Sequence, residues 1–343
     1  MAYTTIDNPV DFFNTKLYTG TGSSNSVTGV GFQPDMTWIK NRDQADEHNL
    51  YDAVRGATKR LIPNNSTVEG TQLNGLSAFG SDGFTVVDSN ATNINTENYV
   101  AWNWKANGAG SANTNGSISS SVSVNTTAGF SIVKWTGSGA NATIGHGLGT
   151  TPSMLIVKNT SGTGGWRVWS EKLGSTQSLL MDGANAAITS AGQFNSSATF
   201  NSTVFSVGGE GDTNESGSTI IAYCFAEKQG YSKFGSYTGN GNADGTFVYT
   251  WFKPAFVMVK RTDSANDWCL YDNKRDTYNV VQDKLQPNQS SAESDDTSMD
   301  FVSNGFKFRE TGGNFNASGG SYIYMAFAED PFTNSGFVPN NAR

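Results

Sequence analysis

Few residues in this chain have types and spacing that could support catalysis. The two histidines, His48 and His146, lack a Gly-x-Ser-x-Gly elbow with which to form a nucleophilic triad. Glycosidases place two carboxylates on either side of one bond, whereas Glu227 and Glu329 stand at the ends of separate predicted strands. We therefore expect a protein that is not an enzyme and has no catalytic residues.

Cofactor and metal patterns are equally weak. The chain has only two cysteines, and zinc sites need more ligands at tighter spacing. The glycine-rich stretch 20–31 precedes a strand pattern rather than a helix, so a hairpin loop is expected instead of a dinucleotide site. Acidic residues at 293–296, and Asp272 with Asp276, could offer oxygen atoms to Ca²⁺. We expect no cofactor and no metal site, with Ca²⁺ as the alternative.

Three residues are candidates for ligand binding. A sugar can stack its apolar face on an exposed indole, and Trp251 lies outside the repeated positions described below. Trp166 and Trp268 occupy matched positions, which favours a place in the core. Asp272 and Arg275 form the second candidate, because loops that vary between repeats are where binding specialises. The alternative for this pair, which the sequence favours, is an ion pair that fixes a turn.

These candidates lie in a unit that occurs three times. Each copy contains, in one order, an aromatic-Thr-Gly-x-Gly pattern, a proline, a lysine that closes an apolar run, and a ring residue eight positions after the lysine. The landmarks are Tyr18, Pro34, Lys40 and His48 in the first copy; Trp135, Pro152, Lys158 and Trp166 in the second; and Tyr237, Pro254, Lys260 and Trp268 in the third. Tyr-Asp-x-x-Arg at 51–55 recurs at 271–275, while the second copy has Trp169, Ser170 and Leu173 there.

Each unit has the pattern of a β protein. Short runs rich in β-branched and aromatic residues, such as 130–135, 246–251 and 321–327, are bounded by Gly, Asn, Asp and Ser. About 100 residues with many short strands predict an all-β protein of three tandem antiparallel β-sandwich domains, either jelly-roll or concanavalin-like. We expect each domain to pack around its own aromatic core.

The composition places boundaries between the units. A Gly/Ser/Asn-rich stretch reads as a flexible linker between the first two units, whereas the second and third are joined too closely for a hinge. The predicted segments are sandwich repeats at 1–106, 118–228 and 229–332, the linker at 107–117, and a loose C-terminal tail at 333–343.

Charge and hydropathy exclude several classes of function. The chain carries 22 Lys+Arg against 30 Asp+Glu, a net charge of -8, which argues against a nucleic-acid partner. No apolar run approaches the length of a membrane span, and the first residues lack the basic and apolar regions of a secretory signal. We therefore expect that the protein does not insert into a membrane. With only two cysteines, we also expect that it is made in a reducing cytoplasm.

The chain resembles a repeat domain of unknown function found in structural proteins of marine tailed bacteriophages. The resemblance rests on GFQPD at 31–35, YDAVRG at 51–56, NYVAWNWK at 98–105, KFGSYTGNG at 233–241 and YIYMAFAE at 322–329. It implies a virion protein assembled in the host cytoplasm, and it implies no catalytic residues.

On this basis we expect a tail fibre or knob adhesin that contacts a receptor or glycan on the host surface. One alternative is a capsid or tail decoration protein without a receptor role, and another is a polysaccharide depolymerase. Other virion proteins are the expected partners. A homotrimer would suit a fibre or knob, although three units in one chain could instead imitate a trimer as a monomer.

Overall fold

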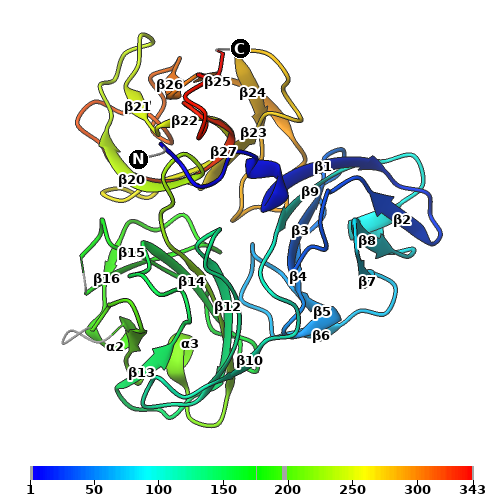
Figure 1. The fold of residues 1–343 in the computed structure, drawn as a ribbon, viewed down its shortest axis with the longest axis vertical. Helices are drawn as coiled ribbons and strands as arrows, with labels where there is room; N and C mark the ends of the chain where they lie inside the picture. The colour runs from blue at the N-terminus through cyan, green and yellow to red at the C-terminus, as the bar shows by residue number, and fades with distance from the viewer. Residues whose placement is uncertain (1–2, 175, 195–198, 342–343) are drawn as a thin grey trace.

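The computed structural model describes residues 3–341 except 175 and 195–198. Strands dominate, and the few helical segments are single turns. Every sheet draws its strands from only one of three consecutive stretches of chain, which we call unit 1 (β1–β9), unit 2 (β10–β19) and unit 3 (β20–β27). Figure 1 shows the units as three lobes around a common centre, with both chain ends beside unit 3.

Unit 1 contains a six-stranded sheet, in the order β1-β9-β3-β4-β5-β6, and a three-stranded sheet, β2-β8-β7. Its elements are η1 (Pro9–Asp11), β1 (Phe13–Thr19), β2 (Asn25–Thr28), β3 (Met36–Asn41), β4 (Asn49–Asp52), β5 (Gly56–Leu61), β6 (Gly70–Thr71), β7 (Leu76–Gly80), β8 (Gly83–Val86), α1 (Asn90–Asn93) and β9 (Asn98–Trp104).

Unit 2 contains an eight-stranded sheet, β10-β11-β12-β19-β14-β15-β16-β17, and the pair β13-β18. Its elements are β10 (Ser111–Asn113), β11 (Ser120–Asn125), β12 (Phe130–Thr136), β13 (Ala142–Gly145), β14 (Met154–Asn159), β15 (Arg167–Ser170), β16 (Gln177–Leu180), β17 (Ile188–Thr189), α2 (Ala191–Phe194), β18 (Val204–Val207), α3 (Gly211–Asn214) and β19 (Thr219–Phe225).

Unit 3 contains two four-stranded sheets, β20-β27-β22-β23 and β21-β26-β25-β24. Its elements are β20 (Ser232–Thr238), β21 (Phe247–Tyr249), β22 (Phe252–Arg261), β23 (Cys269–Asp272), β24 (Val281–Lys284), β25 (Ser294–Val302), β26 (Gly305–Phe308) and β27 (Ser321–Pro331).

Four equivalent strands lie side by side in the larger sheet of units 1 and 2 and make up the whole of one sheet in unit 3. Their orders are β1-β9-β3-β4, β12-β19-β14-β15 and β20-β27-β22-β23. The registers also match, because the landmark lysines pair with Val100, Ile221 and Ile323 in the equivalent strands β9, β19 and β27. The all-β, antiparallel prediction is confirmed, while the jelly-roll or concanavalin-like assignment stays a prediction.

The described residues form four hydrophobic cores rather than the three that were expected. One local core lies inside each unit, and a fourth contains residues from all three units. Side chains alternate between the two faces of a strand, so β9 directs Tyr99 and Ala101 into the local core of unit 1 and Trp102 and Trp104 into the shared core. The expectation of separate cores is therefore incomplete.

Ring nitrogens at the matched positions join each unit to a neighbour. Trp166 of unit 2 donates from Nε1 to the carbonyl of Ile62 in unit 1 (2.9 Å), and Trp268 of unit 3 donates to the carbonyl of Leu180 in unit 2 (2.8 Å). His48 of unit 1 completes the circle, with Nε2 at 3.1 Å from the carbonyl oxygen of Gln286 in unit 3. The three units thus form a closed ring.

The landmark lysines strengthen two of these boundaries. Lys158 donates to the carbonyl of Ser66 in unit 1 (3.1 Å), and Lys260 donates to the carbonyl of Ala184 in unit 2 (3.2 Å). Lys40, Lys158 and Lys260 are all fully buried, and this burial lowers the pKa of each ammonium group to about 8.

The segments expected to be a flexible linker and a loose tail are both tied to the rest of the molecule. Within 107–117, β10 pairs with β11, and the Asn107 N–H donates to Ser123 Oγ (2.8 Å). In the C-terminal segment 333–343, whose last two residues lie outside the described part, the Ser335 N–H donates to Asp7 Oδ1 (2.6 Å). The composition of these two segments did not indicate these hydrogen bonds.

Candidate functional site

The predicted site residues Asp272 and Arg275 lie at the boundary between units 3 and 1. Both side chains are fully buried, and Arg275 Nε donates to Asp272 Oδ2 over 2.6 Å. Asp272 also accepts from the backbone N–H of Arg275 (3.0 Å) and from Trp102 Nε1 of unit 1 (3.0 Å). The pair therefore fixes its turn, as the sequence favoured, and offers no exposed atoms to a ligand.

The equivalent pair in unit 1 plays the same part against unit 2. Arg55 Nε contacts Asp52 Oδ2 (2.5 Å), and the Tyr223 hydroxyl of unit 2 donates to that same oxygen (2.7 Å). Tyr223 and Trp102 occupy matching positions in β19 and β9. The two boundaries are thus built from one pattern, a ring donor from one unit and a carboxylate from the next.

The absence of this pair from unit 2 follows from the same arrangement. Ser170 and Leu173 replace the aspartate and the arginine there, and the residue of unit 3 at the position of Trp102 and Tyr223 is Met325. Leu173 and Met325 both belong to the shared core. A methionine has no hydrogen to donate, so a buried carboxylate at Ser170 would lose its partner. The difference between the repeats reflects unit packing rather than a variable binding loop.

Trp251 belongs to a row of exposed aromatic side chains on unit 3. Phe247 and Tyr249 in β21 are 46% and 42% exposed, and Trp251 just beyond the strand is 36% exposed. Ring centroids are 6.5 Å apart for the first pair and 6.1 Å for the second. β21 is also an edge strand of its sheet. We call these three residues the aromatic edge.

Polar groups surround the aromatic edge. The ammonium of Lys233, from β20, lies 4.6 Å from the centroid of the Trp251 ring, within the range of a cation–π interaction. The Tyr3 hydroxyl donates to the carbonyl of Trp251 (2.6 Å), which fastens the N-terminal segment beside it. Burial raises the pKa of Tyr3 to about 12, so this hydroxyl stays protonated at neutral pH.

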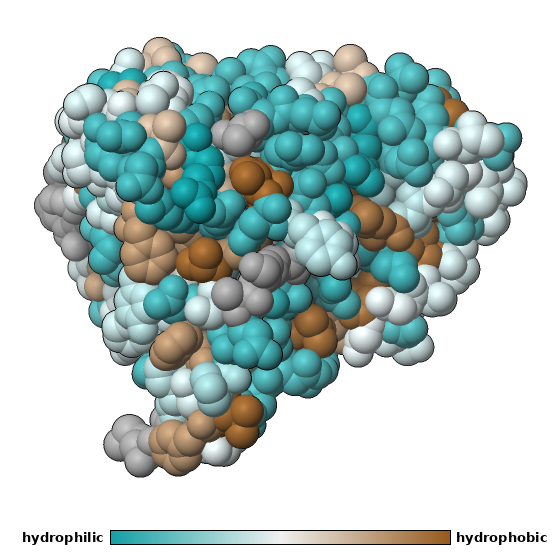
Figure 2. Space-filling model, turned by 90° about the horizontal axis from the view of Figure 1, so that it is seen from above, coloured by the Kyte–Doolittle hydropathy of each residue, from teal (hydrophilic) through white to brown (hydrophobic). Residues whose placement is uncertain are grey.

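A cavity of about 500 Å³ opens beside the aromatic edge, and we call it the edge cavity. Phe247 and Tyr249 line it together with Lys233 of β20 and with Glu227, which precedes that strand, and Lys172 extends into the lining from unit 2. Apolar rings and a few polar groups around one hollow are typical of small-molecule sites. In the face seen in Figure 2, hydrophilic residues cover most of the surface and hydrophobic residues form separate patches.

The aromatic edge is specific to unit 3. Val248, at the centre of β21, pairs with Phe306, as Val27 pairs with Phe84 and Ile144 with Phe205. The residues that flank these matched positions are Ser26 and Thr28 in unit 1, Thr143 and Gly145 in unit 2, and Phe247 and Tyr249 in unit 3. The sheet therefore does not require aromatic residues there. The sequence analysis found Trp251 but missed its neighbours, which an alignment of the three copies at this strand would have indicated.

The backbone at Trp251 is also unusual. Its φ angle is +73°, in the left-handed region that costs a side-chain-bearing residue about 1–2 kcal/mol. Three residues before the landmark proline, where unit 3 has Trp251, unit 1 has Gly31 (φ +92°) and unit 2 has Gly149 (φ +72°). Unit 3 thus keeps a tryptophan in a conformation for which the other units use glycine. Strain of this kind is concentrated at functional sites.

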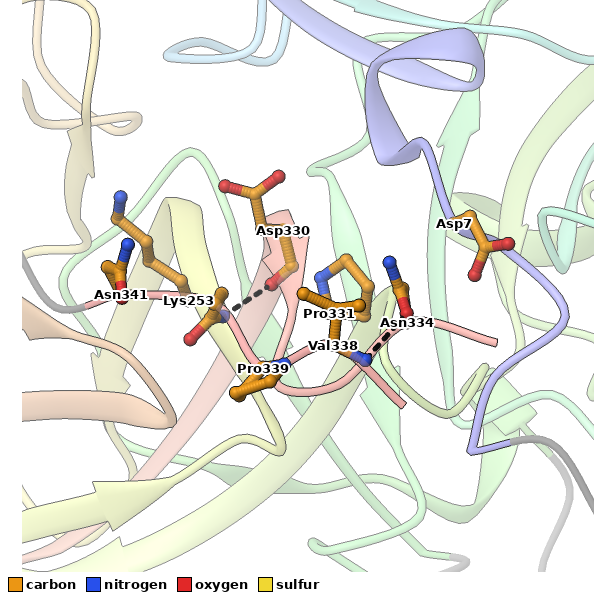
Figure 3. Close-up of a pocket in the computed structure, with 9 residues that line it drawn as sticks. Asp7, Lys253, Asp330, Pro331, Asn334, Val338, Pro339 and Asn341 are labelled. Carbon is orange, nitrogen blue, oxygen red and sulfur yellow. Dashed lines mark hydrogen bonds between the residues drawn. The ribbon is translucent and has the colours of Figure 1, made fainter. Parts of the chain in front are cut away.

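A second hollow, of about 320 Å³, lies between the N-terminal and C-terminal segments, and its lining mixes polar with apolar residues. Asp7 borders it from the N-terminal segment, and Lys253, Asp330 and Asn334 border it from unit 3 (Figure 3). The Asn334 side chain accepts from the backbone N–H of Val338 (2.9 Å), and Lys253 forms a salt bridge with Glu329 (3.4 Å). Its polar groups hold the terminal segments in place, so we regard it as a structural contact.

Two further candidates from the sequence, His48 and Glu293, occupy structural positions. His48 is fully buried and accepts from Trp38 Nε1 at Nδ1 (2.9 Å), and burial lowers its pKa well below the usual value. Glu293, in the acidic stretch considered for Ca²⁺, forms salt bridges with Arg42 and Arg275. In the described part of the chain, no group of three or more His, Cys, Asp or Glu residues is arranged to hold a metal ion.

Among the residues that the structure covers, no helix is both long and apolar enough to cross a membrane.

Comparison with known families assigns the chain to one of them. A family model described as a domain of unknown function (DUF7483) matches residues 8–331. The chain belongs to this family. The match runs through all three units, from η1 to the end of β27. No curated protein and no solved structure shows a significant match.

Proposed function

We propose that this chain is a non-enzymatic surface protein of a tailed-bacteriophage particle that contacts a host glycan through the aromatic edge of unit 3. The observation that supports the glycan-binding role is the row of exposed rings Phe247, Tyr249 and Trp251 in unit 3, of which the first two line the edge cavity. The resemblance of the sequence to phage structural proteins supports the location on a virion.

The chemistry of the aromatic edge suits a sugar. The C–H bonds on one face of a pyranose lie flat against an aromatic ring, while its hydroxyl groups need polar partners around the rim. Ser236, Glu227 and Lys233 supply such partners in the edge cavity. The closed ring of units supports a rigid platform, and a rigid platform reduces the ordering cost of binding.

A second candidate function is decoration of a capsid or tail without a receptor role. The position of β21 at the edge of its sheet favours it, because an unpaired edge can accept a strand from another protein. However, β21 has only three residues, and short edge strands limit such pairing. The exposed rings therefore argue more strongly for glycan contact.

The test replaces Phe247 and Tyr249 with the residues of unit 1, giving Phe247→Ser together with Tyr249→Thr. Wild-type protein should bind one or more polysaccharides in a panel of bacterial surface glycans, and the double variant should lose at least tenfold in affinity. Tyr278→Ala is the matched control, because Tyr278 is 80% exposed yet does not line the edge cavity. Unchanged binding by the double variant would refute the proposed site, and new reducing ends in the bound polysaccharide would indicate a depolymerase.

A further inference from the structure

We infer that the edge cavity selects acidic glycans, in which a carboxylate on the sugar meets the ammonium of Lys233 while the sugar face stacks on the aromatic edge. This inference rests on the proposed function and deepens it by naming the class of ligand.

Lys233 is placed where a ligand could meet both the charge and the rings. Its side chain lines the edge cavity, and its ammonium lies over the Trp251 ring at 4.6 Å from the centroid. Tyr249 lines the same cavity, with its centroid 6.1 Å from that of Trp251. A sugar stacked on the aromatic edge would therefore have its substituents within reach of a positive charge.

The charge of Lys233 is not neutralised by an ion pair within the described residues. Lys233 is half-buried, and this burial lowers its pKa, which shows that the ammonium has lost part of its hydration. Glu227 acts on it through its charge without forming a salt bridge, and Glu227 is exposed, so solvent screens its effect. A carboxylate from a ligand would supply a charge-assisted hydrogen bond that the protein leaves open.

The surrounding lining also favours an anion. Lys172 extends into the cavity from unit 2 as a second ammonium, and it is paired with Glu171 (2.9 Å), which lies outside the lining. The lining itself carries two cationic groups and one carboxylate, on a chain whose net charge is -8. Such an arrangement favours a single acidic sugar at this point over general attraction of a polyanion.

Lys233 is specific to unit 3, as the aromatic edge is. The matched positions in β1 and β12 hold Asn14 and Ser131, because each residue directly follows the one paired with Trp104, Phe225 or Phe327. A lysine and three aromatic residues therefore differ from the other units at four positions that meet in space. Packing of the common fold does not require this set, whereas recognition of an acidic sugar does.

The experiment compares oligosaccharides of galacturonate, glucuronate and mannuronate with their carboxyl-reduced forms by titration calorimetry. Wild-type protein should bind an acidic oligosaccharide at least tenfold more tightly than its reduced partner. Lys233→Met should remove that difference, Lys233→Arg should retain most of it, and added salt should weaken only the acidic ligand. Lys105→Met is the matched control, because Lys105 also lies over aromatic rings, at 5.9 Å from Phe12 and from Phe32, but does not line the cavity.

The outcomes separate this inference from the proposed function. Equal binding of acidic and reduced forms, or an unchanged preference in Lys233→Met, would overturn the selection of acidic glycans and leave glycan binding intact. Failure of both these oligosaccharides and the wider polysaccharide panel to bind would overturn the proposed function, and this inference with it.

Discussion

Arg275 offers a direct test of how the units are held together. The proposed change is Arg275→Leu, which introduces the residue that unit 2 has at this position, Leu173. In the wild-type protein the buried guanidinium contacts Asp272 (2.6 Å) and Glu293 (2.8 Å). The leucine removes the only positive charge bonded to Asp272 among the described residues and leaves that carboxylate buried.

We expect Arg275→Leu to lower the free energy of unfolding strongly, because it leaves the buried Asp272 carboxylate without its cation. Breaking a buried ion pair by removing one partner destabilises a protein by about 3–5 kcal/mol. The triple variant Asp272→Ser, Arg275→Leu and Glu293→Ala copies all three residues of unit 2, where Ala187 takes the place of Glu293. It leaves no buried, unpaired carboxylate at Asp272. Its losses are the acceptor of Trp102 Nε1, worth about 1–3 kcal/mol, and the salt bridge of Glu293 with the partly exposed Arg42, which keeps its contact with Asp283. The triple variant should therefore be more stable than the single variant.

The assay is urea unfolding at pH 7, followed by tryptophan fluorescence, with the free energy of unfolding compared between variants. Lys172→Leu serves as the control, because it breaks an exposed pair with Glu171 and should cost less than about 1 kcal/mol. A free energy for Arg275→Leu within 1 kcal/mol of the wild-type value would refute the reasoning. A triple variant less stable than Arg275→Leu would refute it equally.

Three further predictions concern the buried groups. Tyr223→Phe should cost about 1.5–3 kcal/mol in urea unfolding, because its hydroxyl bonds to a buried carboxylate, whereas Tyr231→Phe should be near neutral, since that hydroxyl has no hydrogen-bond partner among the described residues. The stability of the wild type relative to Lys158→Met should rise between pH 8 and 10.5. The pKa of Lys158 is about 8 in the folded state and 10.5 in the unfolded state, so in this range only the unfolded chain keeps the proton on Lys158. A stability difference that does not change with pH would contradict this. The stability of wild type relative to His48→Gln should fall as the pH drops below 6.5, because only the unfolded imidazole takes up a proton there; parallel pH profiles would exclude it.

The repeat landmarks predicted much of the fold because they are packing positions. Trp166 and Trp268 were assigned to the core from their matched places, and both are buried at unit boundaries. The shared core was not predicted, although β3 and β14 carry a signal for it. Every residue of these strands is buried, and a continuous apolar run is typical of strands covered on both faces. Which surface covers the second face depends on the arrangement of the units, which the repeat pattern does not specify.

The candidate site was predicted in part. Trp251 stood out because it had no counterpart among the landmarks, and it is exposed beside a cavity-lining strand. Its contact with Lys233 could not be predicted from the sequence, because the two residues lie 18 positions apart and only the fold brings the β20 lysine to the Trp251 ring. Asp272 and Arg275 were weighed as a ligand site because unit 2 lacks them. The explanation is that unit 3 has Met325 at the position of the ring donors. Met325 lies more than 150 residues from Ser170 of unit 2 along the chain.

The most direct test of the central claim is the glycan affinity of Trp251→Gly and Trp251→Ala, measured with their free energies of unfolding. Both variants remove the ring, and the glycine also relieves the positive φ angle of +73°. We predict that both lose at least tenfold in affinity for a glycan that the wild type binds, and that the glycine variant is more stable than the alanine variant by about 1 kcal/mol. Wild-type affinity in both variants would contradict a binding role for the aromatic edge.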